Sequence, residues 1–171
     1  MPVDTVAIET SCGTTYAMPF VPSLLHITVT DPRLEYCCAL TRDNMSPYLN
    51  RLEQRFSEGR WRSLAPQASF YLIVDSTITS NNPWGFLSVR DDPDAPTALH
   101  IGDIQLEAQH HGRGIGSKVL ELVDKLARSL NRAEITLNVF HDNTRAKRLY
   151  ERCGFREIDT QLDKLTMRKT L

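Results

Sequence analysis

Three glycines at alternate positions are the residues of this sequence with the clearest chemical use. Gly112, Gly114 and Gly116 form the run. An apolar segment at 99–106 precedes it, and apolar residues at helical spacing follow it over 115–130. The pattern predicts a strand, a loop and a helix. Backbone N–H groups at a helix N-terminus bind anions, and glycines leave those groups uncovered, so we expect a site for phosphate or pyrophosphate.

Two known phosphate-binding motifs can be compared with this loop. The nucleotide P-loop reads Gly-x-x-x-x-Gly-Lys-Ser/Thr, whereas this chain has Gly116-Ser117-Lys118, so its lysine is displaced and a P-loop is excluded. The dinucleotide motif reads Gly-x-Gly-x-x-Gly, and this chain offers Gly-x-Gly-x-Gly with Asp142 further on as a candidate ribose ligand. The loop therefore indicates a phosphorylated cofactor, and a dinucleotide stays open at this point.

The segment after the predicted helix narrows the choice. Residues 135–140 alternate apolar and polar side chains like a half-buried strand. Asn143 is placed to cap a short helix that Gly154 ends. The glycine loop, followed by Asn143, Ala146, Leu149, Tyr150, Gly154 and Phe155 at this spacing, resembles the GNAT superfamily of N-acetyltransferases. The resemblance covers residues 98–155 and extends back to about residue 36.

The resemblance implies acetyl-CoA as the cofactor. In such enzymes two central strands splay apart and the pantetheine arm lies in the gap, with a backbone N–H, here that of Leu106, facing the thioester oxygen. The loop amides from His111 to Ser117 would hold the pyrophosphate. The residues that the resemblance places against the cofactor are Gln105, Leu106, Glu107, His111, Gly112, Arg113, Gly114, Ile115, Gly116, Ser117, Asn143, Ala146 and Tyr150.

Tyr150 stands where the resemblance places the general acid. A phenol stays protonated near neutral pH and can protonate a departing thiolate. Ala146, Leu149, Tyr150 and Cys153 also recur at helical spacing, which is typical of residues that face the core. The sequence leaves both roles open, and we expect the catalytic one.

The attacking amine must first lose a proton, and three side chains near the first central strand can accept it. They are His100, Asp103 and Glu107, and we expect His100 because imidazole titrates in the useful range. Asn138 stands where the branch of the family that acetylates ribosomal protein N-termini has a catalytic glutamate, and an amide cannot act as that base. His111 replaces the usual arginine or glutamine, so any cationic contact to phosphate falls to neighbouring residues.

Length and composition set the outer bounds. A chain of 171 residues with 41% hydrophobic residues fits one domain with a full core. Its 20 basic and 21 acidic residues give a formal net charge of -1, which argues against a nucleic-acid partner. No apolar run reaches the roughly 18 residues of a membrane span, so we expect no membrane partner and a cytoplasmic protein. Its four cysteines lack Cys-x-x-Cys spacing, so we expect free thiols and no metal.

The remaining segments complete an α/β domain. Residues 36–41 read as a first strand, and Ser46-Pro47 as the start of a helix. Two further strand pairs are predicted at 69–75 with 84–90 and at 155–160 with 164–169. The resemblance implies the GNAT fold, a mixed and centrally splayed sheet flanked by helices.

Domain limits follow from the same segments. We expect a single acetyltransferase domain over 36–171, preceded by an arm of unknown role over 1–35. That arm is open to three interpretations: an extra strand, a contact in a homodimer, or partial disorder.

These inferences predict an N-acetyltransferase that moves an acetyl group from acetyl-CoA to a primary amine by direct attack in a ternary complex. The acceptor is the amine of a small molecule or of a protein or peptide, bound near residues 46–64 and 156–164. An alternative is a CoA-binding regulatory or interaction module without turnover. A dinucleotide-binding oxidoreductase is less favoured, because no second catalytic constellation accompanies the loop.

Overall fold

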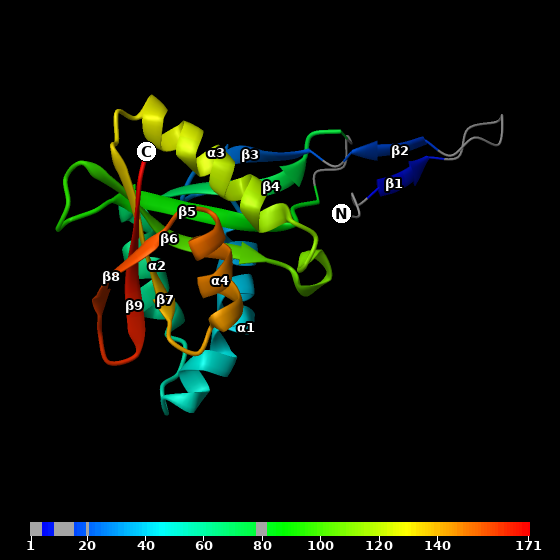
Figure 1. Ribbon diagram of the computed structural model, residues 1–171. Coiled ribbons are helices and arrows are strands. Elements are labelled where there is room, and N and C mark those ends of the chain that lie inside the picture. The colour runs from blue at the N-terminus through cyan, green and yellow to red at the C-terminus, as the bar shows by residue number, and fades with distance from the viewer. Residues whose placement is uncertain (1–4, 9–15, 20, 78–81) are drawn as a thin grey trace.

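A seven-stranded mixed sheet forms the centre of the molecule, with the strand order β3-β4-β5-β6-β7-β9-β8 (Figure 1). The computed structural model describes residues 5–8, 16–19, 21–77 and 82–171. The strands are β1 (Thr5–Ile8), β2 (Tyr16–Pro19), β3 (Pro22–Ile27), β4 (Ser69–Asp75), β5 (Gly85–Asp91), β6 (Ala98–Leu106), β7 (Glu134–Phe140), β8 (Arg156–Thr160) and β9 (Lys164–Thr170). The α-helices are α1 (Leu34–Arg51), α2 (Glu58–Leu64), α3 (Ile115–Ser129) and α4 (Thr144–Arg152).

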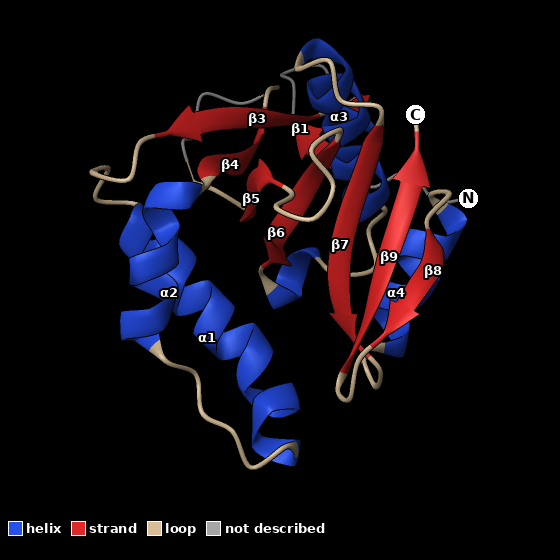
Figure 2. Ribbon diagram, turned by 90° about the vertical axis from the view of Figure 1, so that its left-hand side faces the viewer, coloured by secondary structure: helices blue, strands red, loops and turns tan. Residues whose placement is uncertain are grey.

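The two central strands, β6 and β7, separate partway along their length. They are the parallel pair of the sheet, and their pairing runs only from Ala98 with Glu134 to Ile101 with Leu137. Both strands continue beyond this point, and Figure 2 shows them diverging toward their C-terminal ends. The predicted mixed sheet with a central splay is therefore confirmed.

A β-bulge in β6 accounts for the separation. On β5, Ser88 pairs with Asp103 and Val89 with Ile101, which leaves Gly102 as an extra residue. A bulge bends its strand and increases the local twist. Pairing with β7 ends at Ile101, immediately before this extra residue, so β6 turns away from its parallel neighbour where the bulge begins.

Each face of the sheet carries its own pair of helices (Figure 2). Val119 and Val123 of α3 and Tyr150 of α4 belong to one core cluster, together with the inward residues of β6 and β7. The second cluster joins Leu34 and Cys37 of α1 to residues of β4 and β5. The splay therefore opens between two layers of helices that pack on opposite faces.

The prediction for residues 36–41 is wrong, because this segment lies within α1. Leu34, Cys37, Cys38 and Thr41 are its buried residues, and their spacing of three and four is that of one helix face. The prediction that Ser46-Pro47 starts a helix is also wrong, because Pro47 lies inside α1. α1 begins at Leu34, two residues before the start of the predicted strand.

Part of the segment 1–35 belongs to the central sheet. β3 pairs antiparallel with β4 and forms one edge of the seven-stranded sheet. β1 and β2 pair with each other in a separate two-stranded sheet. Residues 1–4, 9–15 and 20 lie outside the described residues. The expected boundary at residue 36 falls within α1.

The other predicted elements are confirmed, with ends that differ by a residue or two. They include the strands at 69–75, 84–90 and 135–140, the helix after the glycine loop and the final strand pair. Among the described residues, none of the helices has both the length and the apolar composition needed to cross a membrane.

We predict that Gly85→Ala destabilises the protein by about 1–3 kcal/mol, because β5 and β6 approach too closely for a side chain at this position. A Cβ atom there would lie 2.0 Å from the backbone oxygen of Gln105. Thermal unfolding of Gly59→Ala provides the control, since a Cβ at Gly59 meets no atom within 4 Å. A melting temperature of Gly85→Ala equal to that of the wild type would contradict the described pairing.

Candidate active site

A cavity of about 880 Å³ lies where β6 and β7 separate. Its walls come from both faces of the sheet, including α1 and α2 on one side and the α3 and α4 N-termini on the other. The predicted site residues that line it are His100, Gln105, Leu106, His111, Gly112, Gly114, Ile115, Gly116, Ser117, Asn143, Ala146 and Tyr150. Glu107 and Arg113 are not among its lining residues. Within the described ranges, no group of three or more His, Cys, Asp or Glu side chains is placed to hold a metal.

The glycine loop ends one wall of the cavity, and its glycines serve two different purposes. Gly112 and Gly114 have φ angles of 78° and 75°, a left-handed conformation that L side chains rarely adopt. Gly116 packs closely against α4, because a Cβ there would lie 2.8 Å from Cδ2 of Leu149 and this side chain would have to shift. The loop thus brings the start of α3 close to α4.

The N-terminus of α3 offers backbone donors. Gly114 is the N-cap residue and makes no side-chain cap hydrogen bond. The N–H groups of the first helical turn have no carbonyl within the helix to bind. The N–H of His111 is used differently, since it donates to the carbonyl of Ala108 at 3.1 Å. The backbone N–H of His111 is therefore not available to a phosphate, and the candidate donors are the later N–H groups of the predicted range 111–117.

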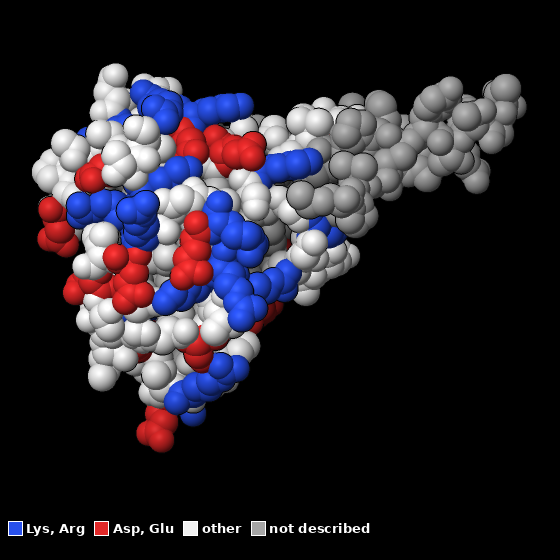
Figure 3. Space-filling view, in the orientation of Figure 1, with Lys and Arg blue, Asp and Glu red and all other residues white. Residues whose placement is uncertain are grey.

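Cations gather near this helix start. α4 contains Arg145, Lys147, Arg148 and Arg152, and Figure 3 shows Lys and Arg side chains concentrated over it. Lys147 pairs with Glu157 at 3.2 Å. Arg145 and Arg152 line the cavity. The arrangement adds positive charge to the backbone donors, which suits an anion with more than one phosphate.

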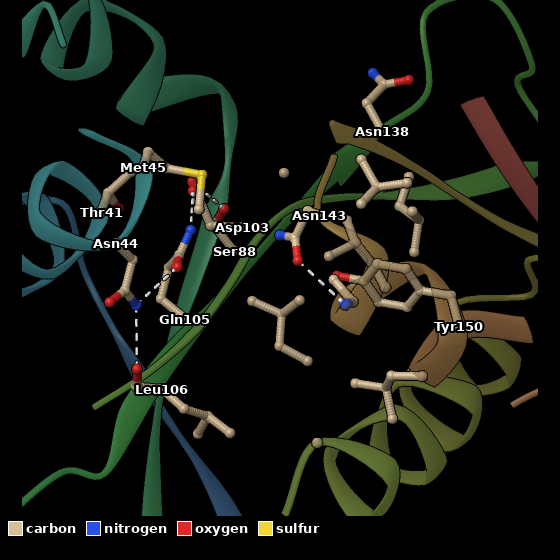
Figure 4. A pocket seen from close by; sticks show the side chains of 18 of the residues that line it. Thr41, Asn44, Met45, Ser88, Asp103, Gln105, Leu106, Asn138, Asn143 and Tyr150 are labelled. Atoms are coloured by element: carbon tan, nitrogen blue, oxygen red, sulfur yellow. Dashed lines mark hydrogen bonds between the residues drawn. The ribbon is translucent and has the colours of Figure 1, made fainter. Parts of the chain in front are cut away.

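The C-terminal end of β6 forms the opposite edge of the gap. The N–H of Glu107 donates to the carbonyl of Trp84 at 2.9 Å, on the side of β5. Backbone groups alternate along a strand, so the N–H and carbonyl of Leu106 point into the gap. The carbonyl accepts there from Asn44 Nδ2 at 3.1 Å (Figure 4). It also accepts from His111 Nε2 at 2.9 Å. The N–H of Leu106 lies on the same side of β6 as this carbonyl and therefore faces the cavity.

Three further residues of this loop and strand end, Glu107, Arg113 and His111, have hydrogen-bond partners within the protein. Glu107 accepts from Tyr36 Oη at 3.2 Å and from Gln109 Nε2 at 2.8 Å, which keeps its carboxylate outside the cavity. Arg113 Nη1 lies 3.2 Å from His110 Nδ1. The ring of His111 ties the loop to β6 through Leu106 and has a structural task of its own.

Asn143 lies at the start of α4 and faces the gap (Figure 4). Its Oδ1 accepts from the N–H of Ala146 at 3.2 Å, which caps the helix as predicted. The two Nδ2 hydrogens remain as donors beside the cavity. One amide group can therefore hold the helix end and bind a carbonyl of a ligand.

Tyr150 lies in the core and also faces the cavity. Its ring belongs to the core, is 7% exposed, and packs edge-on against Phe155 with centroids 5.8 Å apart. Its side chain also lines the cavity and reaches toward the gap (Figure 4). Burial raises the pKa of the phenol, and the charge of Asp103 raises it further. The hydroxyl is therefore protonated at neutral pH and remains a proton donor.

Asp103 lies on β6 beside the bulge and faces the same cavity. Its Oδ2 accepts from Ser88 Oγ at 3.2 Å, and its Oδ1 from Gln105 Nε2 at 3.4 Å. Burial raises the pKa of this carboxyl, while these hydrogen bonds, one from Trp61 and the charge of Lys164 oppose the rise. Among the lining residues that the structure describes, it is the only acidic one.

His100 lies further from the gap on β6, in a polar chain of three residues. Its Nδ1 lies 2.9 Å from Thr136 Oγ1, and Thr136 donates its hydrogen to Asp92. Nδ1 must therefore carry the imidazole hydrogen, which leaves Nε2 as an acceptor. Burial lowers the pKa of His100 to about 4, the charge of Arg90 lowers it as well, and Asp92 opposes both.

The wall formed by α1 and α2 corresponds to the predicted acceptor region only in part. Tyr48, Phe56 and Trp61 line the cavity as expected from the range 46–64. Of the range 156–164, only Lys164 does so among the described residues. Residues that the sequence reasoning missed here are Thr41, Asn44, Met45, Ser88 and Arg90.

The splayed mixed sheet, with the glycine loop at the start of α3, defines an acetyltransferase fold. The sequence model of the Acetyltransferase (GNAT) family matches residues 34–155, and the chain belongs to this family.

Two sequence relatives share parts of the chain. The uncharacterized N-acetyltransferase YycN of Bacillus subtilis is 33% identical over 81 residues, which cover 47% of this chain and 52% of the relative. N-alpha-acetyltransferase 40 of Saccharomyces cerevisiae is 41% identical over 64 residues, covering 33% of this chain and 22% of the relative. The matched segments thus span about half and less than a quarter of these relatives.

Solved structures extend the likeness to most of the chain. The crystal structure of YycN has a TM-score of 0.69 at 20% identity and covers 84% of this chain and 97% of its own. The spermidine N-acetyltransferase of Vibrio cholerae, in complex with CoA and spermine, has a TM-score of 0.68 at 17% identity, with 87% and 95% covered. At these identities the likeness shows the fold.

We predict that His100 makes the protein sensitive to acid. Because its pKa is about 4 when folded and 6.5 when exposed, the unfolded chain binds the proton first as the pH falls below 6.5. The stability that depends on neutral His100 is therefore complete above pH 6.5 and lost toward pH 4, by an amount of about 2–3 kcal/mol.

Urea unfolding at pH 7.0 and pH 4.5 measures this loss. His100→Gln should lose less stability than the wild type between the two pH values, and His26→Gln, at an exposed position on β3, should lose as much as the wild type. Equal losses in all three proteins would show that His100 does not become harder to protonate on folding.

Proposed function

We propose that this chain transfers an acetyl group from acetyl-CoA to a primary amine by direct attack in a ternary complex. One observation carries the proposal. A single cavity joins the glycine loop, on the side of α3 and α4, to the groove beside α1 and α2, and it passes between Leu106 and Tyr150 at the splay. Two ligands entering such a cavity from its two ends meet inside the sheet, at a polar backbone edge and a buried phenol.

The cofactor end suits CoA in each of its parts. The N–H groups at the start of α3 and the guanidinium groups of Arg145 and Arg152 would hold the phosphates. Asn143 would donate to the pantetheine arm from Nδ2. When bound, acetyl-CoA supplies an acetyl group as a thioester that an amine can attack. The Leu106 N–H would stabilise the charge that develops on the carbonyl oxygen.

Asp103 is the better placed of the candidate bases. Its charge acts on the Tyr150 phenol, so it lies near the point where the leaving thiolate must be protonated. His100 is a weak base, because burial and the charge of Arg90 lower its pKa to about 4 against the opposing charge of Asp92. We therefore propose Asp103 as the general base. His100, which the sequence favoured for that role, would act as a hydrogen-bond acceptor in the acceptor groove.

The proton transfers then follow in order. Asp103 accepts a proton from the acceptor ammonium, directly or through one water, and the freed nitrogen lone pair forms the new C–N bond. The C–S bond breaks, and the Tyr150 hydroxyl gives its proton to the sulfur. The proton left on the nitrogen product passes to solvent, and Tyr150 recovers its own from Asp103 or water.

The cellular setting is proposed on chemistry alone. Cys37, Cys38 and Cys153 are free thiols, which suits a reducing compartment such as the cytoplasm. The amine belongs to a small molecule or to a protein or peptide, since the names of the relatives include both kinds of acetyltransferase.

Titration calorimetry with acetyl-CoA tests the cofactor end. We expect saturable binding in the micromolar range, with no binding of NAD or ATP under the same conditions. Gly114→Val should weaken it by about 10-fold or more, because valine disfavours the φ of 75° that presents the α3 donors. Gly59→Ala serves as the matched control. Absence of acetyl-CoA binding by the wild type would remove the proposal.

Turnover tests the residues at the splay. Tyr150→Phe keeps the ring in the core and should lower kcat by about 10²-fold, while the Kd for acetyl-CoA stays within about 2-fold. Asp103→Asn should lower kcat/KM by about 10²-fold or more, and His100→Gln by less than about 10-fold. A larger loss in His100→Gln than in Asp103→Asn would exchange the two roles. Binding of acetyl-CoA without turnover of any amine would favour the alternative of a regulatory CoA-binding module.

A further inference from the structure

More cationic than acidic side chains line the cavity, and the cations lie at both of its ends. Asp103 provides the one negative charge among the described lining residues. Arg145 and Arg152 provide positive charge at the end assigned above to the cofactor phosphates. Two other cations, Arg90 and Lys164, line the acceptor side, where a positively charged amine must enter. Their presence there calls for a reason.

Arg90 is placed close to the proposed amine site. Phe86, Ser88 and Arg90 point to the same face of β5, since side chains alternate along a strand. The Cα of Arg90 therefore lies about 7 Å along the strand from that of Ser88, whose hydroxyl donates to Asp103. In the next strand, Arg90 pairs in register with His100, which also lines the cavity.

Lys164 approaches the same region from the other side of the splay. It pairs in register with Phe140 at the end of β7, and its Nζ lies 4.8 Å from the centre of the Phe140 ring. Its charge also acts on the Asp103 carboxyl. The charge of Lys164 thus reaches Asp103 from β9, and Arg90 lies two residues along β5 from Ser88, the register partner of Asp103.

Neither cation forms an ion pair within the part of the chain that the structure describes, which covers 5–8, 16–19, 21–77 and 82–171. The other two cations of β9 have acidic partners. Arg168 lies 3.6 Å from Glu134, and Lys169 lies 2.6 Å from Asp124. Arg90 and Lys164 are therefore the two cations of β5 and β9 that have no acidic partner among the described residues.

We infer that the acceptor is a primary amine that also carries an anionic group, such as a carboxylate, held by Arg90 and Lys164 while Asp103 receives the ammonium. The inference rests on the proposed function and names its substrate class. A guanidinium binds a carboxylate through two parallel hydrogen bonds, which fixes the orientation of the ligand as well as its charge.

The same arrangement selects against polycations. A polyamine brings several positive charges, and this groove is lined by one carboxylate and two cations, so the additional ammonium groups would be repelled. A zwitterion or an acidic peptide matches the charges in sign and in order. Two sources share this chemistry: a free amino acid, and a peptide whose N-terminal amine is followed by an acidic side chain.

Matched acceptors test the inference with the full chain and saturating acetyl-CoA, by following release of free CoA thiol. The small-molecule set is phenylalanine, phenylalaninamide and phenethylamine. The peptide set compares Ala-Asp-Ala-amide with Ala-Asn-Ala-amide, and spermidine completes the panel. We expect kcat/KM to be at least about 10-fold higher for the acidic member of one set, because a charged pair is replaced by a neutral contact in its partner. The set that shows the preference identifies the source.

Arg90→Gln and Lys164→Gln each should reduce this acid-to-amide ratio of kcat/KM by about 5-fold or more, mainly through KM. Arg128→Gln, in the last turn of α3 and outside the cavity, should keep the wild-type ratio. The Kd for acetyl-CoA, measured by calorimetry in every variant, reports that the fold and the cofactor end are intact. Two variants are used so that one which fails to fold leaves the other to decide.

The outcomes separate the two proposals. Turnover of amines with equal kcat/KM for acidic and neutral partners in both sets, or with spermidine as the best acceptor, would overturn this inference and leave the acetyltransferase proposal standing. A preference for acids that neither Arg90→Gln nor Lys164→Gln reduces would also overturn it. Binding of acetyl-CoA without turnover of any amine would overturn the proposed function, and the inference with it.

Discussion

The extra residue at Gly102 is the constraint on which the rest of the site depends. It breaks the register between β5 and β6, and the pairing of β6 with β7 ends just before it. Two consequences follow from one local irregularity. The sheet opens at its centre, and Asp103 faces the groove beside α1 while the backbone of Leu106 faces the gap. A regular strand of the same length would have closed the sheet with a continuous ladder of hydrogen bonds.

Buried polar groups around the gap are satisfied by one another, which fixes their positions before any ligand arrives. Asn44 donates to both Gln105 and Leu106, Gln105 donates to Asp103, and Asp103 also accepts from Ser88. Such a network is costly to leave partly unpaired in a buried place, so its members hold each other in a single arrangement. Preorganised donors and acceptors of this kind need little rearrangement when charge develops during a reaction.

The sequence predicted the cavity lining near α3 and α4 better than the lining on α1, β5 and β9, and the reason is physical. The glycine loop, the Asn143 cap and Tyr150 are local: each depends on neighbours within one strand–loop–helix unit. Arg90 and Lys164 come from β5 and β9, and only the tertiary fold brings them to one cavity. The helix α1 was misread because a short window around residues 36–41 hides the helical spacing that Leu34 and Thr41 complete. For the same reason Asn44, which lies on α1 and lines the cavity, was not predicted as a site residue.

Asn44 also ties the two halves together mechanically. It projects from α1, which forms a wall of the acceptor groove, and its amide grips the carbonyl of the residue whose N–H faces the gap. A shift of α1 to fit a differently shaped acceptor would therefore pull on the end of β6. The choice of acceptor and the position of the β6 backbone thus both depend on Asn44. Substitutions in α1 that broaden the range of acceptors during evolution are constrained by the need to keep β6 in place.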